Sequence, residues 1–532
     1  MITLEGLKAQ LKAGRIDRRR FMEGALALGT TVVAAEAMMG KALAAQSKGG
    51  TFKQALTGGA TSDSMDPAKI LDTYMINVSS QLRNNLTEIG SDNQLRAELA
   101  ESWEASADAA TWTFKLRQGV EFTNGKSLEA EDVVQSFLHH MGEGTDSAAK
   151  GLVEQVTEVK SDGKNTVVFT LSGGNADWPF IVSDYHLPIC PAKDGGGIDW
   201  ESGTGTGGYK VVSYEPGGTT IVERNPNYWK ENAAFFDSIE NLFIADATAR
   251  TSALIGGQLQ TISNLQPKTM GLLSRNPNIA IVPTYGNKHC TFPMHSDTAP
   301  YDNNDVRLAL KYAMDREQLL KTILFGYGEV GNDHPVGPAN VFRATPDELP
   351  QRAFDPEKAK FHLKKAGLDS LDVELYVASS AFEGAIDAGA LFQETARKSG
   401  ITINLNRAPD DGYWSNVWLK QPFSASYWGG RPTEDWIFSQ IYKSGVDWNE
   451  AKWSNERFDT LLVEARAELD QTKRRDMYVD MQRILNEEGG SIIPLFLAYT
   501  HAISTDIELP EQVASNWELD GHKNGERWSF KA

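Results

Sequence analysis

The chain has 532 residues, of which 41% are hydrophobic and 23% charged, as in an ordinary soluble globular protein. Its formal net charge is −19 at pH 7, and removing residues 1–45, which carry a net +3, takes the remainder to about −22. A field of that sign repels nucleic acid and anionic membrane surfaces, which excludes a nucleic-acid-binding protein. The length favours two or three lobes over one core.

The first 45 residues have the features of a secretory signal. A basic segment with Arg18, Arg19 and Phe21 precedes a weakly apolar run, and Ala42 and Ala44 supply an A-x-A cleavage site. The paired arginines are typical of the twin-arginine type, which exports folded proteins. The alternative is an amphipathic helix that stays attached. We expect a mature protein that begins near residue 45 or 46, is free in the periplasm and has no membrane span.

The next segments predict strands and one helix. Residues 49–56 predict an opening strand, and residues 112–116 alternate apolar and polar side chains, as a half-buried strand does. A helix is expected after residue 128, because Glu129, Glu131 and Asp132 would lie in its first turn, where the macrodipole favours anions. Residues 166–171 predict a further strand.

The glycine-rich segment 203–210 does not predict a nucleotide site. It lacks the G-x-x-x-x-G-K-[ST] spacing, and the residues after it favour a strand and a turn. A phosphate would therefore find no helix N-terminus to bind.

The second half of the chain alternates helix and strand signals. Asp355 and Pro356 predict a helix start and Gly367 its end. Strands at 373–377 and 401–405 with a helical run between them imply a parallel pair with a crossover. Apolar stripes predict two more helices, over 458–469 and 477–485, and we interpret these stripes as ordinary core.

Residues 413–453 are unusually aromatic and hold six of the 13 tryptophans. Their spacing follows neither the helical nor the strand period. Aromatic walls with a few polar groups are typical of a small-molecule pocket. The alternative is that these rings belong to the core. We predict a ligand site formed by Tyr413, Trp414, Tyr427, Trp428, Gly429, Gly430, Arg431 and Trp436.

We find no pattern for catalysis or metal binding. H-E-x-x-H, G-x-S-x-G and C-x-x-C motifs are absent from the sequence. His139 and His140 are adjacent on a predicted helix, so their side chains diverge by about 100° and cannot share a metal. His289, Cys290 and His295 are metal-ligating types, but a solvated loop is the favoured interpretation. We expect no catalytic residues, no metal and no cofactor.

Cys190 and Cys290 are the two cysteines of the sequence. They could pair in an oxidising compartment, but so large a protein does not depend on a disulfide framework. Two separate buried thiols are the favoured prediction.

Several short motifs follow one another between about residue 49 and the C-terminus. They include E-L-A-E-S-W at 98–103, T-W-T-F-K-L-R-Q-G-V-E-F at 111–122, E-A-E-D-V at 129–133, G-T-G-G-Y-K at 205–210, R-N-P-N-Y-W at 224–229, D-A-T-A-R at 246–250 and a set within 305–328. Together they resemble the family 5 extracytoplasmic solute-binding proteins, which are peptide, dipeptide and nickel receptors of ABC importers.

The resemblance implies an α/β fold of the large type II periplasmic-binding-protein class, with two lobes that close over ligand and an extra domain. The expected bounds are 46–72, 187–282 and 495–532 for lobe I, 73–186 for the extra domain and 283–494 for lobe II. Cys190 and Cys290 would then lie near the crossovers between lobes, where a disulfide is conceivable. The implied partners are a membrane permease and, indirectly, its ATPase subunits, with the receptor itself a monomer.

One position departs from the family pattern. Peptide-binding relatives carry an acidic residue three positions after the tryptophan that matches Trp428, and it pairs with the ligand's α-ammonium; this chain has Arg431. A guanidinium repels an ammonium and binds a carboxylate with two hydrogen bonds. The alternative is a structural ion pair with Glu434 and Asp435. If Arg431 faces the cleft, we predict a ligand with an anionic group there and an apolar or cyclic part against Tyr413, Trp414, Trp428 and Trp436.

We interpret the chain as a periplasmic receptor that captures a peptide or peptide-like solute by closing around it and delivers it to the permease. One alternative keeps the fold but changes the cargo to an opine-like conjugate, an oligosaccharide or a metal chelate. A second alternative, from another class, is a hydrolase exported by the twin-arginine route, for which a catalytic constellation would be required.

Overall fold

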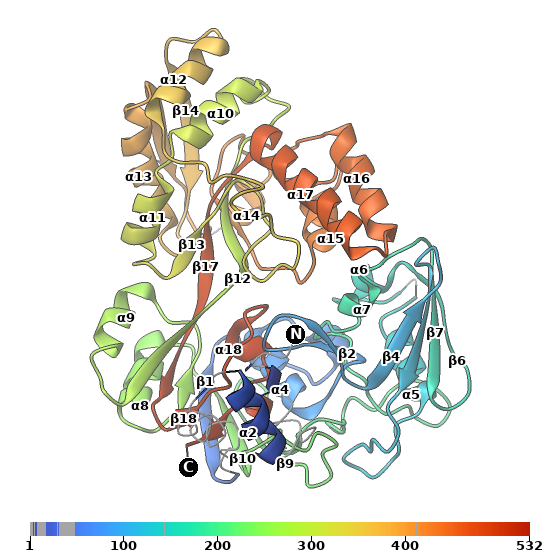
Figure 1. The fold of residues 1–532 in the computed structure, drawn as a ribbon. Helices are drawn as coiled ribbons and strands as arrows, with labels where there is room; N and C mark the ends of the chain where they lie inside the picture. Colours follow the sequence, from blue (N-terminus) through green and yellow to red (C-terminus); the bar gives the residue numbers. More distant parts are fainter. Residues whose placement is uncertain are drawn as a thin grey trace.

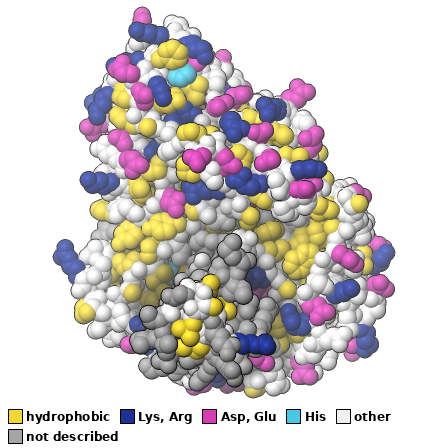
Figure 2. All heavy atoms as spheres, in the orientation of Figure 1, with side chains coloured by type: hydrophobic (Ala, Val, Ile, Leu, Met, Phe, Trp, Pro, Cys, Tyr) yellow, Lys and Arg dark blue, Asp and Glu magenta, His cyan; other side chains and the backbone are white. Residues whose placement is uncertain are grey.

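The computed structural model describes residues 4, 6–7, 18–28, 30, 48–142, 144–410 and 412–531. Figure 1 shows an upper body and a lower body, with a separate sheet unit beside the lower one. None of the described helices is long and apolar enough to cross a membrane. Figure 2 shows apolar side chains at the level where the bodies meet, while charged groups crowd the outer face of the upper body.

A mixed sheet of nine strands runs through both bodies. Strand β1 is parallel to β10 and β11, and the other pairings are antiparallel. The strand order is β16 (Ser426–Trp428), β12 (Ile279–Pro293), β17 (Ser491–Ser504), β11 (Thr261–Ile262), β1 (Thr51–Leu56), β10 (Ser238–Phe243), β9 (Thr219–Arg224) and β8 (Tyr209–Tyr214), with β13 (Gly328–Val330) beside β17.

The lower body packs α4 (Thr73–Leu82) against this sheet. Asp72 caps the helix by accepting from the backbone N–H of Met75, and residues such as Tyr74 and Val78 join the core around Phe52. The ring of Phe52 stacks on that of Phe236 with 4.4 Å between centroids. The expectation that the extra domain starts at residue 73 is therefore corrected, because α4 shares its core with β1 and β10.

Residues 86–189 form the separate sheet unit, with their own hydrophobic core. The sheet is antiparallel, and its order is β4 (Ala100–Ala105), β5 (Thr111–Leu116), β7 (Thr166–Leu171) and β6 (Val156–Ser161). Helix α5 (Ala130–Leu138) covers it and starts with a capping box between Glu129 and Asp132. The strands predicted at 112–116 and 166–171 and the helix predicted after residue 128 are confirmed. We call residues 86–189 the four-stranded unit.

The upper body contains the predicted crossover. Strands β14 (Leu371–Val377) and β15 (Ile401–Arg407) are parallel and are joined by α13 (Ala385–Arg397). Asp355 caps α12 (Pro356–Lys365), as predicted. The two helices predicted from their stripes are α16 (Glu456–Ala467) and α17 (Gln471–Glu488), which pack on each other.

The remaining described elements are short or peripheral. They are α2 (Arg18–Ala27), β2 (Thr87–Ile89), β3 (Leu95–Ala97), α6 (Lys150–Val153), α7 (Trp178–Ile181), α8 (Ala247–Ile255), α9 (Pro267–Leu273), α10 (Asn304–Tyr312), α11 (Arg316–Ile323), α14 (Tyr413–Asn416), α15 (Glu434–Ile437), α18 (Glu518–Gly521), α19 (Asn524–Arg527), β18 (Ile507–Glu508) and β19 (Ser529–Phe530), with single turns of 3₁₀ helix at Pro67–Lys69 and π helix at Phe438–Tyr442.

Two long strands connect the bodies. The first part of β12, with Ile279, packs in a core of the lower body, whereas Cys290 and Phe292 pack in the core of the upper body. Its partner β17 passes between the same cores. The pairing of β12 with β17 shifts register between Tyr285 and His289, which is between the two bodies.

Two expectations concern the termini and the cysteines. Arg18 and Arg19 lie in α2 and Phe21 is buried, but Ala42 and Ala44 lie outside the described residues, so the export signal stays a prediction. Cys190 and Cys290 are separate, buried and free, as favoured from the sequence. Burial raises the pKa of the Cys290 thiol to about 12.

Candidate ligand-binding site

The aromatic stretch divides between core and surface. Tyr413 is 1% exposed and its hydroxyl donates to the carbonyl of Ala425 at 2.7 Å, while Trp428 is 6% exposed and packs in a core with Ile437. These two predicted ligand contacts are corrected to core residues. Trp414 and Tyr427 are 39% and 40% exposed.

The exposed rings rest on buried ones. Trp414 meets Tyr427 at 5.8 Å and Trp418 at 5.9 Å between centroids, and Trp418 meets Trp428 at 6.0 Å. Such edge-to-face contacts hold large rings in fixed orientations. We call Trp414 and Tyr427 the aromatic shelf.

Arg431 is held by neutral groups. Its Nε donates to Oε1 of Gln440 at 2.9 Å, and its Nη1 donates to the carbonyls of Gly429 and Gly430 at 3.1 and 3.2 Å. The guanidinium carbon lies 5.7 Å from the ring centre of Trp436. Nη2 makes no hydrogen bond to any described residue, so the fixed guanidinium keeps one nitrogen for another partner.

The structural ion pair considered for Arg431 is not formed. Glu434 accepts from the backbone N–H of Phe342 at 2.7 Å, and Asp435 pairs with Arg466 at 3.0 Å. Burial lowers the pKa of Arg431, and the nearby Tyr185 and Asp184 act in the opposite direction.

The glycine before Arg431 permits a close backbone contact. A Cβ at Gly430 would lie 3.0 Å from the Cβ of Asn287 and 3.3 Å from its carbonyl carbon. The amide of Asn287 donates to the carbonyl of Arg431 at 3.1 Å. These contacts fix the segment 429–431 against β12.

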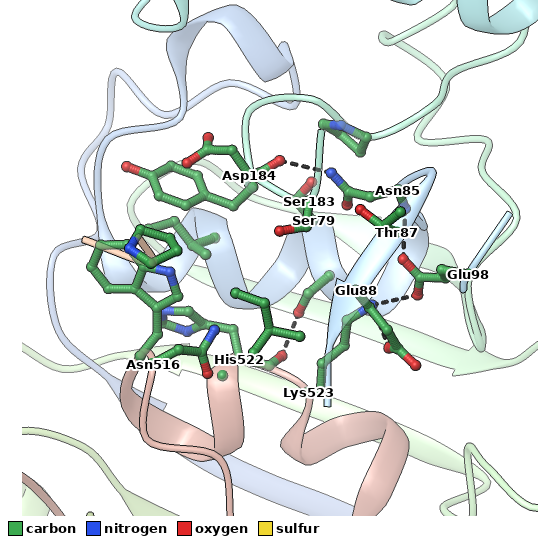
Figure 3. A pocket seen from close by; sticks show the side chains of 18 of the residues that line it. Ser79, Asn85, Thr87, Glu88, Glu98, Ser183, Asp184, Asn516, His522 and Lys523 are labelled. Carbon is green, nitrogen blue, oxygen red and sulfur yellow. Dashed lines mark hydrogen bonds and ion pairs between the residues drawn. The ribbon is translucent and has the colours of Figure 1, made fainter. Parts of the chain in front are cut away.

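A cavity of about 60 Å³ lies beside this segment and is lined by Pro432, Tyr185 and Trp517, among others. Figure 3 shows Ser183 and Asp184 on one side of it, Asn516 and His522 on another, and Glu88 and Glu98 at its far end. The volume suffices for a few water molecules. In this conformation the two bodies therefore leave little space between Pro432 and the four-stranded unit.

The acidic end of the cavity is internally neutralised. Glu88, Glu98 and Glu526 are close enough together to ligate a metal. The Lys230 ammonium lies 3.1, 3.1 and 2.8 Å from their respective carboxylates, so it occupies the position that a metal ion would take. We interpret this cluster as a structural network.

The four-stranded unit also touches α17 directly. Asp177 Oδ1 and Arg474 Nη2 are 2.7 Å apart, with side chains 4% and 2% exposed. The backbone N–H of Ala176 donates to the carbonyl of Arg466 at 2.7 Å. Glu434 is nearby, and burial raises its pKa to about 7. We call the contacts of Ala176 and Asp177 with Arg466 and Arg474 the seam.

Two segments of the chain, one on each side of the contact, lead from the seam to the site. Asp177 is followed by α7 and then by Asp184 and Tyr185 beside Arg431. On the other side, Arg431 and Pro432 lead into α15, whose Asp435 pairs with Arg466. The position of the four-stranded unit is thus tied to the site.

His289 and Cys290 lie in β12 and are buried, which corrects the solvated loop expected from the sequence. His289 donates through Nδ1 to the carbonyl of Asn287 at 2.8 Å, and burial lowers its pKa to about 4. The reason is the length of β12, which continues through both bodies.

Sequence reasoning missed Tyr185, Lys288, Tyr499 and Trp517 as neighbours of Arg431 or of its cavity. They come from four segments outside the aromatic stretch. Only the fold brings them together, and no local motif around them indicated it.

Comparisons with known proteins agree on one family. The pattern of the bacterial extracellular solute-binding proteins, family 5 Middle, matches residues 94–450. Heme-binding protein A of Haemophilus influenzae is 25% identical over 461 residues, covering 80% of this chain and 83% of that protein. The dipeptide-binding protein of Escherichia coli is 26% identical over 526 residues, covering 88% and 92%. The structure of HbpA2 from Haemophilus parasuis superposes with a TM-score of 0.79 at 21% identity, covering 91% of this chain and all of that one (100%).

Proposed function

Because the chain belongs to the bacterial extracellular solute-binding proteins of family 5, we propose that it is the periplasmic receptor of an ABC importer for a peptide or peptide-like solute with an anionic group. The family is one of binding proteins, which makes capture and release the expected activity. The relatives named for dipeptide and for heme support a small organic cargo. The permease that receives the cargo would be a separate chain.

The environment of Arg431 is the observation that supports an anionic group on the solute. Its guanidinium is fixed by neutral oxygens, has no carboxylate partner in the described ranges and has Nη2 left over. A cation that has lost much of its water gains most from a charged hydrogen-bond acceptor. A carboxylate at Nη2 would supply this, and the aromatic shelf and Trp436 would cover the apolar part of the solute.

We assign the lower body to lobe I, the four-stranded unit to the extra domain and the upper body to lobe II. Capture would close the upper body onto the other two and exclude water from the charged contact, which strengthens it. The mechanism needs no bond to be made or broken in the solute.

Native mass spectrometry of protein purified from the periplasm without refolding tests this function. We expect a bound small solute that carries at least one acidic group and is small enough for a closed pocket of at most about 1,000 Å³. It should leave on denaturation with its mass unchanged. Progressive conversion of the species during incubation would instead indicate an enzyme, and a basic species without an acid would contradict the role given to Arg431.

We also propose export by the twin-arginine route. The double substitution Arg18→Lys and Arg19→Lys should leave the uncleaved chain in the cytoplasm, because that route reads the arginine pair. Fractionation and immunoblotting of cells measures this, with Arg15→Lys as the matched control. Normal export of the double variant would argue for another signal type.

A further inference from the structure

A second cation, Lys288, lies in the same region. It is part of β12, and its ammonium is 5.9 Å from the ring centre of Tyr427 on the aromatic shelf. The ammonium has no hydrogen bond or ion pair with any residue that the structure describes. Burial lowers the pKa of Lys288, and the one charge that opposes this is Glu518.

The strand register places Lys288 and Arg431 at one end of β16. His289 pairs with Trp428 and Cys290 with Tyr427, so the next step brings Lys288 opposite Gly429. Nη1 of Arg431 donates to the carbonyl of Gly429 and would lie 3.7 Å from a Cβ there. Tyr427 is two residues before Gly429, so its side chain lies on the same face as that of Lys288, because side chains alternate along a strand.

The two cations have different acidic neighbours. Asp184 is the carboxylate whose charge raises the pKa of Arg431, whereas Glu518 is the carboxylate whose charge raises the pKa of Lys288. Neither acid is bonded to its cation: Asp184 accepts from His186 at 2.7 Å, and Glu518 accepts from Thr73. The cations are therefore two positions rather than one shared contact.

Two partly buried cations without bonded counter-ions are costly unless a ligand supplies the opposite charge. We propose that Lys288 is a second anion-binding position and that the cargo carries two carboxylates, one at Arg431 and one at Lys288. The second carboxylate would lie beside Tyr427, so the part of the cargo that joins the two acids crosses the aromatic shelf. This inference rests on the proposed function and narrows its substrate class to acidic peptides or peptide-like diacids.

Calorimetric titration with matched dipeptides tests it. The probes are Leu-Glu and Glu-Leu, each compared with its glutamine counterpart, and γ-Glu-Leu, compared with its α-carboxamide, so that the members of each pair differ by one carboxylate. We expect the wild-type protein to prefer at least one diacid by about tenfold or more, as a charged hydrogen bond contributes. Lys288→Met should remove that preference and leave the affinity for the amide counterpart within about twofold. Lys115→Met, on the exposed face of β5, is the matched control.

The outcomes separate the two claims. If the two members of each pair bind equally, or if Lys288→Met keeps the preference for the diacid, the second position is wrong while the receptor function stands. If the wild-type protein binds none of the six dipeptides, both the peptide function and the inference drawn from it fail. Circular dichroism of Lys288→Met confirms that a lost preference does not reflect misfolding.

Discussion

Replacing Arg431 with Asp is expected to lower the affinity for an acidic dipeptide by about thirtyfold or more. The substitution removes a charged hydrogen bond that closure shields from water, and losses of this kind run to about 2–5 kcal/mol. It also places a carboxylate against the carboxylate of the solute. The same change should improve binding of a basic dipeptide, since an ammonium then meets an opposite charge. Fluorescence titration of the tryptophans with Leu-Glu and Leu-Lys measures both effects.

The control for this experiment is Arg457→Asp. Arg457 lies on α16 with its side chain 69% exposed, so the variant makes the same change in net charge away from the site. Its affinities should stay within about twofold of wild type, because exposed charges are screened by salt. An unchanged ratio of acidic to basic affinity in Arg431→Asp would show that this guanidinium does not meet the solute.

Replacing Arg474 with Met is expected to lower the free energy of unfolding by about 3–5 kcal/mol. The change leaves the carboxylate of Asp177 buried in the seam without its cation, and loss of one partner from a buried ion pair has a cost of this size. The double variant Asp177→Asn and Arg474→Met should recover a large part of the loss, because the uncompensated charge is gone. Urea denaturation followed by circular dichroism gives the three free energies.

Arg475→Met supplies the matched comparison for the seam. Arg475 is the next residue of α17 and pairs with Glu348, but both side chains are about one third exposed, 31% and 34%. Its removal should cost less than about 1 kcal/mol, as for other surface pairs. Equal losses for Arg474→Met and Arg475→Met would refute a special role for the buried pair.

Local elements were predictable because their signals are local. Asp355 caps α12 through its own neighbours, and the apolar alternation of residues 112–116 makes β5 half-buried whatever lies around it. The parallel pair of β14 and β15 followed from spacing alone, since a parallel connection needs a crossover of that length. Helix α4 was placed with the extra domain because the core of the four-stranded unit begins at Leu86, only four residues after the helix ends at Leu82.

The candidate site was only partly predictable. Arg431 was identified from its position in the family pattern, but the sequence did not exclude the pair with Glu434 or Asp435, which depends on where α15 points. Tyr413 and Trp428 are of the residue types that often face ligands. The Tyr413 hydroxyl instead donates to the carbonyl of Ala425, and Trp428 packs in a core. Lys288 gave no signal, since a lone lysine on a strand is normally solvated.

The register shift between Tyr285 and His289 has a consequence for the size of the solute around which the two bodies can close. On either side of it β12 and β17 stay paired, so a rotation that separates the bodies would be confined to a few residues, and Lys288 is one of them. The seam lies away from these strands, beyond α15 (Figure 1). A solute too thick to fit beside Lys288 would keep the seam from closing, because the ion pair of Asp177 and Arg474 needs its atoms 2.7 Å apart.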